Sequence, residues 1–392
     1  MAKLIEITGK ALSGEWGSED ENGIGIPILR TTNFTNEGVI NYNNVVTRII
    51  TKKNISEKYL RKGDIIIEKS GGSDKQPVGR VVYYDGLDNT YLFNNFTALL
   101  RVKNQKIWVP RYVFYALLKN YRQGGTIPFE NKTTGLHNLK IDAYINNFEI
   151  NETPINIQQK ICVILEKIQG IIRVRKQQLI DFDTLIKARF VEMFGDPLSN
   201  SREWPCVSVT DACRSILGGG TPAKSHPEYF TGTIPWVSPK DMKSSIISDS
   251  IDHITEEAIA HSTTNLVPEN SVLMVIRSGI LKHTLPVAIN RVPVTINQDM
   301  KAFVPNETVT TAFMMYFFKT IEQDVLSGVR SVTADNIDFK DFKKRTIIVP
   351  PLNLQEQFSA FVTQVDKSKS VIQKSLKETQ LLFDSLMQEY FG

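Results

Sequence analysis

The sequence predicts an α+β protein in which two globular α/β domains are separated by two long antiparallel helices, with a pseudo-two-fold internal repeat. Three observations carry this prediction. The chain has 392 residues, which is too long for one ordinary core and suits two domains of roughly 150 residues. Its second half repeats its first half, and each half ends in a long stretch with apolar residues at helical spacing.

The repeat is tightest at the end of each half. PINIQQK at residues 154–160 matches PLNLQEQ at residues 351–357, an offset of 197 residues. The same offset, carried forward without a gap, places MFG at 193–195 on YFG at 390–392.

Earlier in each half the match is looser but keeps its order. Residues 25–29 face 233–237, residues 62–67 face 269–274, and residues 94–98 face 297–302, at offsets of about 203 to 208. A conserved end and a divergent beginning indicate one function shared by both copies and one that differs between them.

Apolar residues in the tight part follow a heptad pattern, which is typical of coiled-coil helices. The predicted seam is broken by Arg175 and Arg189 in the first copy and by Lys369 and Thr379 in the second. These polar residues either fix the register or extend their charged ends to solvent. A plain two-helix hairpin inside a core is the alternative. The seam consists of Ile161, Leu165, Ile168, Ile172, Leu179, Phe182 and Ile186, and of Phe358, Val362, Val365, Ile372, Leu376, Phe383 and Leu386.

These patterns divide the chain into four segments. They are a first domain at 1–152, a central helix at 153–196, a second domain at 197–350 and a C-terminal helix at 351–392. At about 1.5 Å per residue, residues 161–193 span roughly 48 Å, which exceeds the ~34–36 Å of one DNA turn.

Loops in both domains combine glycine, small polar residues and cations, which are the residue types that contact DNA phosphates and base edges. Solvated surface loops are the alternative explanation. The candidate DNA-binding residues are Arg30, Thr31, Thr32, Asn33, Lys69, Ser70, Gly71, Gly72 and Lys75 in the first domain. In the second they are Ser238, Lys240, Asp241, Arg277, Ser278, Gly279, Lys282 and His283.

Catalytic signatures do not occur in the sequence. No GxxxxGK[ST], GxSxG or HExxH motif is found, and GGGTP at residues 218–222 lacks the lysine of a phosphate-binding loop. The three cysteines form no CxxC pair and the five histidines have no ligand spacing. We therefore expect no catalytic site and no metal site. No apolar run reaches the ~18 residues of a membrane span, so we expect a cytoplasmic protein.

The ordered motifs resemble those of the specificity subunit of type I restriction-modification systems. The resemblance covers essentially the whole chain. It rests on GIPILRTTNF at 25–34, WP at 204–205 followed by GGGTP at 218–222, IPWV at 234–237, PPL with QEQ at 350–357, and LIKARF with MFGDP at 185–197.

The resemblance implies that each domain is a target recognition domain for one half of a bipartite DNA site, with the helices as spacers. It implies two methyltransferase subunits and restriction subunits as partners, which would bind S-adenosylmethionine, ATP and Mg²⁺, while this chain binds no cofactor. A fused methyltransferase is disfavoured because no [DN]PP[YF] motif occurs. A coiled-coil scaffold, or a DNA-binding module without restriction partners, remains the alternative.

Overall fold

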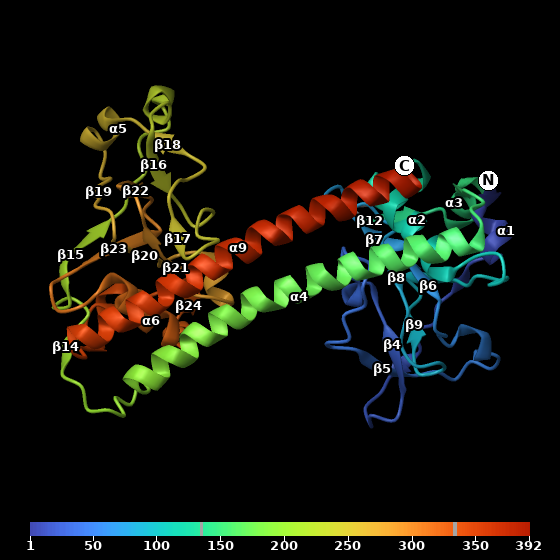
Figure 1. Cartoon of the computed structure of the whole chain (residues 1–392), viewed down its shortest axis with the longest axis horizontal. Helices are drawn as coiled ribbons and strands as arrows, with labels where there is room; N and C mark the ends of the chain where they lie inside the picture. Colours follow the sequence, from blue (N-terminus) through green and yellow to red (C-terminus); the bar gives the residue numbers. More distant parts are fainter. Residues whose placement is uncertain (134–135, 332–334) are drawn as a thin grey trace. The chain divides into compact units, whose positions relative to one another are not determined.

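The computed structural model describes residues 1–133, 136–331 and 335–392. The chain forms two compact units, Met1–Val174 with Ser375–Gly392, and Arg175–Lys374. Two helices of 40 residues, α4 (Ile155–Phe194) and α9 (Leu352–Phe391), run through both units (Figure 1). Each unit therefore contains one globular domain and half of each long helix, so the units cut across the four predicted segments.

The described residues of the first unit's domain form small sheets, two short helices and the 13-residue helix α2. A four-stranded antiparallel sheet has the order β2-β10-β6-β8, and a second sheet has the order β3-β5-β4-β9 with β4 and β9 parallel. A third sheet has the order β11-β12-β7, and β1 pairs with β13. The strands are β1 (Ala2–Lys3), β2 (Leu12–Ser13), β3 (Ser18–Glu19), β4 (Ile26–Leu29), β5 (Val46–Ile49), β6 (Ile65–Glu68), β7 (Ser70–Gly72), β8 (Val81–Tyr83), β9 (Leu92–Phe93), β10 (Thr97–Leu100), β11 (Glu130–Thr133), β12 (Leu136–Leu139) and β13 (Glu149–Ile150), and the helices are α1 (Leu4–Thr8), α2 (Pro110–Arg122) and α3 (Ile141–Asn147).

The domain of the second unit follows the same plan. Its larger sheet has the order β15-β23-β20-β21-β17, its second sheet has the order β18-β16-β22-β19, and β14 pairs with β26. The strands are β14 (Cys206–Ser208), β15 (Cys213–Gly218), β16 (Ile234–Val237), β17 (Ile246–Ile247), β18 (His253–Ile254), β19 (Leu266–Val267), β20 (Val272–Val275), β21 (Val287–Asn290), β22 (Val294–Ile296), β23 (Met300–Pro305), β24 (Arg330–Ser331), β25 (Asp335–Asn336) and β26 (Thr346–Ile348), and the helices are α5 (Glu256–Ala260), α6 (Thr311–Thr320), α7 (Glu322–Ser327) and α8 (Phe339–Phe342).

Hydrogen bonds confirm the predicted repeat at its loosest part. The amide of Asn94 donates to the carbonyl of Leu29, and the amide of Asn297 donates to the carbonyl of Val237, both at 2.9 Å. These bonds follow the parallel pairs β4–β9 and β16–β22. The predicted matches 25–29 with 233–237 and 94–98 with 297–302 therefore occupy the same places in the two domains.

A buried glutamine joins each long helix to its domain, and it is the glutamine of the repeated PxNxQ motif. The side chain of Gln158 accepts from the amide of Val109 (2.8 Å) and donates to the carbonyl of Ile107 (2.9 Å). Gln355 accepts from the amide of Thr310 (2.8 Å) and donates to the carbonyl of Thr308 (2.9 Å). These contacts precede α2 and α6, so the motif holds the start of one helix against the start of another.

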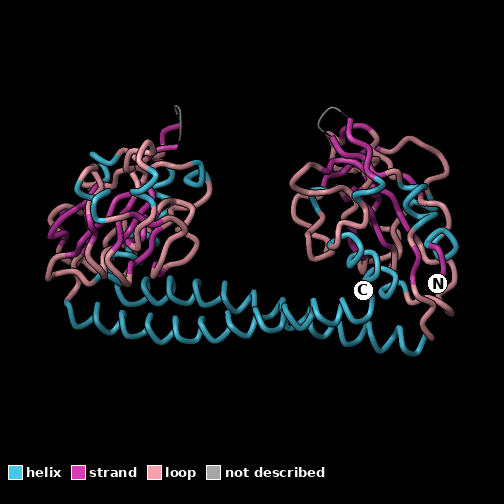
Figure 2. The backbone as a smooth tube through the Cα atoms, turned by 90° about the horizontal axis from the view of Figure 1, so that it is seen from above, coloured by secondary structure: helices cyan, strands magenta, loops and turns pink. Residues whose placement is uncertain are grey.

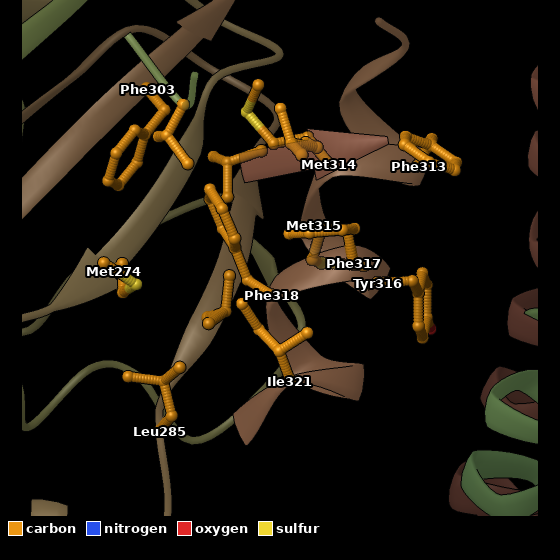
Figure 3. Close-up of a cluster of buried hydrophobic side chains, with 14 of the residues drawn as sticks. Met274, Leu285, Phe303, Phe313, Met314, Met315, Tyr316, Phe317, Phe318 and Ile321 are labelled. Carbon is orange, nitrogen blue, oxygen red and sulfur yellow. The ribbon is translucent and has the colours of Figure 1, made fainter. Parts of the chain in front are cut away.

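The helix α6 forms the centre of the second core, because its sequence TAFMMYFF is apolar on every side. In Figure 3, Met274 and Phe303 lie on one side of α6, and Phe313 and Tyr316 lie on the opposite side. The ring of Phe313 is 4.9 Å from that of Phe194 on α4, between ring centroids. The core thus continues from the sheet through α6 to the long helices.

The halves of α4 and α9 in each unit lie side by side and antiparallel (Figure 2). Near the end of α4, Phe190 and Phe194 contact Phe358 near the start of α9, with ring centroids 5.4 and 5.5 Å apart. In the first unit, Phe383 near the end of α9 shares a core with the first part of α4.

The predicted seam is partly exposed in its middle and buried towards its ends, except at Leu386. The partly exposed members are Leu179, Phe182, Ile372, Leu376 and Leu386. The buried members are Ile161, Leu165, Ile168, Ile172, Ile186, Phe358, Val362, Val365 and Phe383.

The buried members also pack against the cores of the globular domains, as the alternative of a helix pair inside a core anticipated. The heptad pattern missed Phe190, Phe194 and Met387, which are fully or nearly fully buried. They follow four-residue steps because the helices contact a domain as well as each other at these ends.

Lys369 forms a contact between the helices. Its Nζ lies 2.7 Å from Oδ1 of Asp183 on α4, and its side chain is only 14% exposed. This ion pair favours the register-fixing interpretation of Lys369 over extension to solvent.

Candidate nucleic-acid interface

The first candidate segments, 30–33 and 238–241, directly follow the equivalent strands β4 and β16. Oδ1 of Asn33 accepts from the amide of Arg30 (2.9 Å), and Oδ2 of Asp241 accepts from the amide of Ser238 (2.8 Å). Both domains therefore form the same side-chain-to-backbone turn at this place.

Their side chains differ in what they leave accessible. Asn33 is buried, and its Nδ2 also donates to the carbonyls of Asn41 (2.9 Å) and Asn43 (3.2 Å). Asp241 also accepts from the amide of Ile251 at 2.9 Å. The side chains of Asn33 and Asp241 therefore hold their own loops in shape. Thr32 in the first turn and Lys240 in the equivalent turn are exposed.

The second candidate segments, 69–75 and 277–283, follow β6 and β20. Nζ of Lys69 donates to Oγ of Ser13 at 2.8 Å, and burial together with the nearby Lys58 ammonium lowers the pKa of Lys69. In the second domain, Nε of Arg277 donates to Oδ1 of Asp299 at 2.6 Å, while the Arg277 side chain stays half exposed. Each segment thus has a cation next to the sheet, held by one polar partner.

Glycine has a structural role in the first of these segments. Gly71 has a φ of 115°, a conformation that side chains disfavour. A Cβ on Gly72 would lie 2.6 Å from the amide nitrogen of Val78. The loop therefore folds back closely on itself, which brings exposed Lys75 beside Tyr121, Arg122 and Gln380 around a hollow of about 410 Å³.

The remaining candidates lie near these segments. Ser70 Oγ donates to Oδ1 of Asn138 (2.5 Å), and Ser278 caps a short helical turn by accepting from the amide of Ile280 (3.4 Å). Gly279 and His283 are exposed, and Nζ of exposed Lys282 lies 3.9 Å from a carboxylate oxygen of Asp335.

An Arg–Glu pair joins the two segments of the first domain. Arg80 donates to both carboxylate oxygens of buried Glu68, at 3.0 and 2.9 Å. The same guanidinium donates to the carbonyls of Thr31 (3.2 Å) and Phe34 (3.3 Å). Since a planar guanidinium can serve several acceptors in fixed directions, this pair holds segment 30–33 next to the end of β6.

In each domain, a strand that the sequence did not predict lies next to the second candidate segment. It is β12 in the first domain and β25 in the second. In the first domain, β12 pairs with β7, and its Asn138 faces Ser70. In the second domain, Asn336 of β25 pairs with Arg277. The amides of Leu139 and Ile337 donate to the equivalent carbonyls of Lys69 and Ile276, both at 2.9 Å. The similar distance from this element to the PxNxQ motif, 20 residues from Asn138 to Gln158 and 19 from Asn336 to Gln355, was the available signal.

Polar side-chain contacts hold the strands β11 and β12 of the first domain. Nδ1 of His137 lies 2.9 Å from Oε2 of Glu130, and both side chains are buried. Exposed Lys132 on β11 lies 2.8 Å from Asp74 in the second segment. These contacts fix β11 and β12 next to residues 69–75.

The thiols of Cys162 and Cys213 lie in buried and partly buried positions. Burial raises the pKa of Cys162 and Cys213 to about 12, so both thiols stay protonated near neutral pH. Among the described residues, no group of three or more His, Cys, Asp or Glu side chains could hold a metal ion. Nor does any helix within these residues have the length and apolarity to cross a membrane.

Comparison with protein families gives a match in both halves. A family model described as the type I restriction modification DNA specificity domain matches residues 2–181 and again residues 201–380. The two matches together cover most of the chain.

Individual relatives agree with the family match. The chain is 31% identical over 287 residues to the EcoR124I/EcoR124II specificity subunit of Escherichia coli, covering 68% of this chain and 65% of that protein. It is 26% identical over 186 residues to the MjaIX specificity subunit of Methanocaldococcus jannaschii, covering 46% of this chain and 41% of that one. The chain thus matches less than two thirds of either relative's length.

Among solved structures, the S subunit of a type I restriction-modification system from M. genitalium has a similar fold. Its TM-score is 0.58 at 14% sequence identity, over 100% of this chain and 95% of that one. A chain of a type I restriction-modification complex gives a TM-score of 0.54 at 16% identity, over 100% and 96%. At these identities the likeness concerns the fold.

Proposed function

Because the chain belongs to the type I restriction-modification DNA specificity family, we propose that each of its two domains reads one half of a bipartite DNA site. The chain is then a non-catalytic subunit that selects the sequence on which partner subunits act.

One observation carries this proposal: equivalent loops of the two domains present different chemistry on the same scaffold. Exposed Thr32 lies on the turn where the second domain has exposed Lys240. At the next strand end, Ser70 of the first domain occupies the place of Arg277 in the second, as their pairing with Asn138 and Asn336 indicates. Two readers with equal frames and unequal side chains suit two different half-sites.

The long helices support a spacer role. Each is continuous over 40 residues, which is about 60 Å at 1.5 Å per residue. Their ends are fixed to the domains by buried glutamines and by aromatic cores. A helix held in this way transmits its length to the domains, so we infer that helix length determines the gap between half-sites.

Exposed apolar residues on the helices support the recruitment of partner subunits. Val174 and Leu185 of α4 are exposed. Their equivalents in α9 at the offset of 197 residues, Val371 and Leu382, are exposed as well. Equivalent exposed apolar positions on the two helices suit two copies of one partner. We infer that the partners are two methyltransferase subunits, with restriction subunits joining them.

The chemistry belongs to these partners in this proposal. The methyltransferase subunits bind S-adenosylmethionine and take a flipped adenine. The restriction subunits bind ATP and Mg²⁺, and this chain binds no cofactor.

The test is to produce the chain together with its candidate methyltransferase partner in cells and to map modified adenines by single-molecule sequencing. A bipartite motif with one fixed gap is expected. A continuous motif, or no motif despite an active partner, would refute the proposal and favour a scaffold without DNA reading. The partner alone is the control, and it should leave the genome unmodified at that motif.

A further inference from the structure

Two equivalent surface segments of the domains carry opposite charge. The first arm (residues 50–63) connects β5 to β6, and the second arm (residues 255–270) connects β18 to β20 and contains α5 and β19. Their flanking strands correspond, since Arg48 pairs with Ile26 and Ile254 pairs with Ile234 in matching sheets. The first arm has five Lys and Arg and one Glu, whereas the second has three Glu and no Lys or Arg.

The cations of the first arm exceed their local acidic partners. The carboxylate of Glu15 binds the ammonium groups of both Lys52 and Lys58. Lys53 and Lys62 are exposed and form no ion pair within 4 Å among the residues that the structure describes. The arm therefore keeps a positive excess on its surface.

An aromatic side chain adjoins this positive surface. The guanidinium of Arg48, at the end of β5, lies 4.1 Å from the ring centroid of Trp16. Trp16 directly follows Glu15 in the chain, so this pair borders Lys52 and Lys58. A cation stacked on a ring is held in place, since the contact restricts its motion.

The first arm is continuous with the candidate reading segment. Lys58 lies near enough to Lys69 to lower the pKa of that lysine. Ser13, which accepts a hydrogen bond from Lys69, is two residues before Glu15, the partner of Lys52 and Lys58. A row of cations thus leads from the segment after β6 onto the arm.

The second arm occupies the same place with different chemistry. Asn265 Nδ2 donates to the carbonyl of Gly218 at 3.0 Å, and a Cβ on Gly220 would lie 2.5 Å from Oγ1 of Thr263. Neutral contacts therefore attach this arm to residues 218–222. Glu256 and Glu257 are exposed on α5, which makes its surface repel phosphate.

We propose that the first arm binds the phosphate backbone of the DNA that flanks the half-site read by the first domain, and that the second arm makes no such contact. This inference rests on the proposed function and adds to it an asymmetry between the two DNA flanks. A duplex suits the surface because its charge is regular and continues beyond the bases that are read. An acidic protein surface is the competing occupant, and the experiment below distinguishes it.

The test measures how the affinity of the complex with methyltransferase subunits for its bipartite duplex depends on salt. The duplex extends several turns beyond each half-site. In the variant Lys53→Gln/Lys62→Gln, the slope of log K against log salt is expected to become less negative by about 1.8, since each lost phosphate contact removes about 0.9. The matched control Glu256→Gln/Glu257→Gln is expected to keep the wild-type slope.

Trimming the duplex locates the contact. Removing the flank beyond the first half-site should abolish the difference between wild type and the arm variant, and removing the other flank should preserve it. An unchanged slope in the arm variant would overturn the inference. So would a change of equal size and opposite sign in the control, which would indicate a general charge effect.

A weakened association with the methyltransferase subunits, measured by sedimentation at an unchanged DNA slope, would assign the arm to a protein partner and also overturn the inference. Methylation mapping separates these failures from failure of the proposed function. A variant that keeps the bipartite motif but not the predicted slope refutes only the arm, whereas a wild-type complex without such a motif refutes the function itself.

Discussion

At the start of each long helix, one buried glutamine makes hydrogen bonds that join the helix to its domain. Replacing Gln355 by Leu leaves the amide of Thr310 and the carbonyls of Thr308 and Pro350 without their partner. Each unmade buried bond costs about 1–3 kcal/mol, so we expect Gln355→Leu to lower the free energy of unfolding by at least that amount.

Urea unfolding of the full chain checks this expectation. Gln357→Leu, an exposed position on the same helix, should leave the unfolding midpoint nearly unchanged. Equal midpoints for the two variants would mean that the buried glutamine does not stabilise the joint.

Lys319 makes the stability of the second unit depend on pH. Burial lowers the pKa of Lys319 to about 8 from its ordinary 10.5, and its Nζ donates to Oγ of Ser245 at 2.6 Å. Below pH 8 the lysine is protonated in both the folded and the unfolded state, and the desolvation of its charge destabilises the fold fully. Stability should therefore rise between pH 8 and 10.5, by as much as ~3 kcal/mol.

Unfolding of wild type and Lys319→Met across this pH range tests the assignment. The difference in stability between the two proteins should change with pH, and Lys340→Met, at an exposed position, should stay parallel to wild type. If the stability of Lys319→Met also stayed parallel to that of wild type across this pH range, a lowered pKa of Lys319 would be ruled out.

At single positions the sequence predicted residue chemistry better than residue role. Asn33 has the chemistry of an adenine reader, but in the structure all its polar atoms bind backbone of its own loop. Lys240 has the exposure expected of a DNA contact. Whether a polar side chain is satisfied inside the protein depends on loops far along the chain, which a local pattern does not describe.

For the helices, length is the property that the proposed function uses. The contacts of Asp183 with Lys369 and of Phe194 with Phe358 pair the helices antiparallel, so residues 173–179 and 370–376 lie near the centre of the pair. Deleting both segments removes seven residues from each helix, about 10 Å or roughly three base pairs of DNA. We expect the gap of the recognised motif to shorten by about three base pairs while both half-sites persist.

Methylation mapping of the double-deletion protein measures this gap. Deleting only residues 173–179 from α4 should abolish modification, because α9 keeps its full length and the two helices no longer match. An unchanged gap in the double-deletion protein would show that the helices do not determine the spacing.

Long elements were easier to predict than short ones. The repeat and the heptads identified both long helices. The matched IPxx strings identified residues 26–29 and 234–237 as equivalent, although the sequence did not assign them to the strands β4 and β16. The strands β11, β12, β24 and β25 were missed because stretches such as ENKT have no apolar alternation. The heptad pattern did not include Phe190 and Phe194, because the end of α4 packs against a domain as well as against α9.

At the scale of the molecule, the two units share a plan and differ in their surfaces. Equivalent parallel strands, glutamine joints and aromatic contacts recur, while the exposed loops and the two arms diverge. This pattern agrees with the one drawn from the sequence, in which the ends of each half are conserved and the beginnings vary. Under the proposed function, such a chain can change one recognition surface and keep the other.

The independence of the two readers is the central claim, and methylation maps of two matched variants test it most directly. Lys69→Gln in the first domain and Arg277→Gln in the second each remove one cation at the end of an equivalent sheet strand. We expect each variant to relax base preference in a different half-site and to leave the other half-site and the gap unchanged. If either variant altered both half-sites, the domains would not read separately, and the account would be wrong.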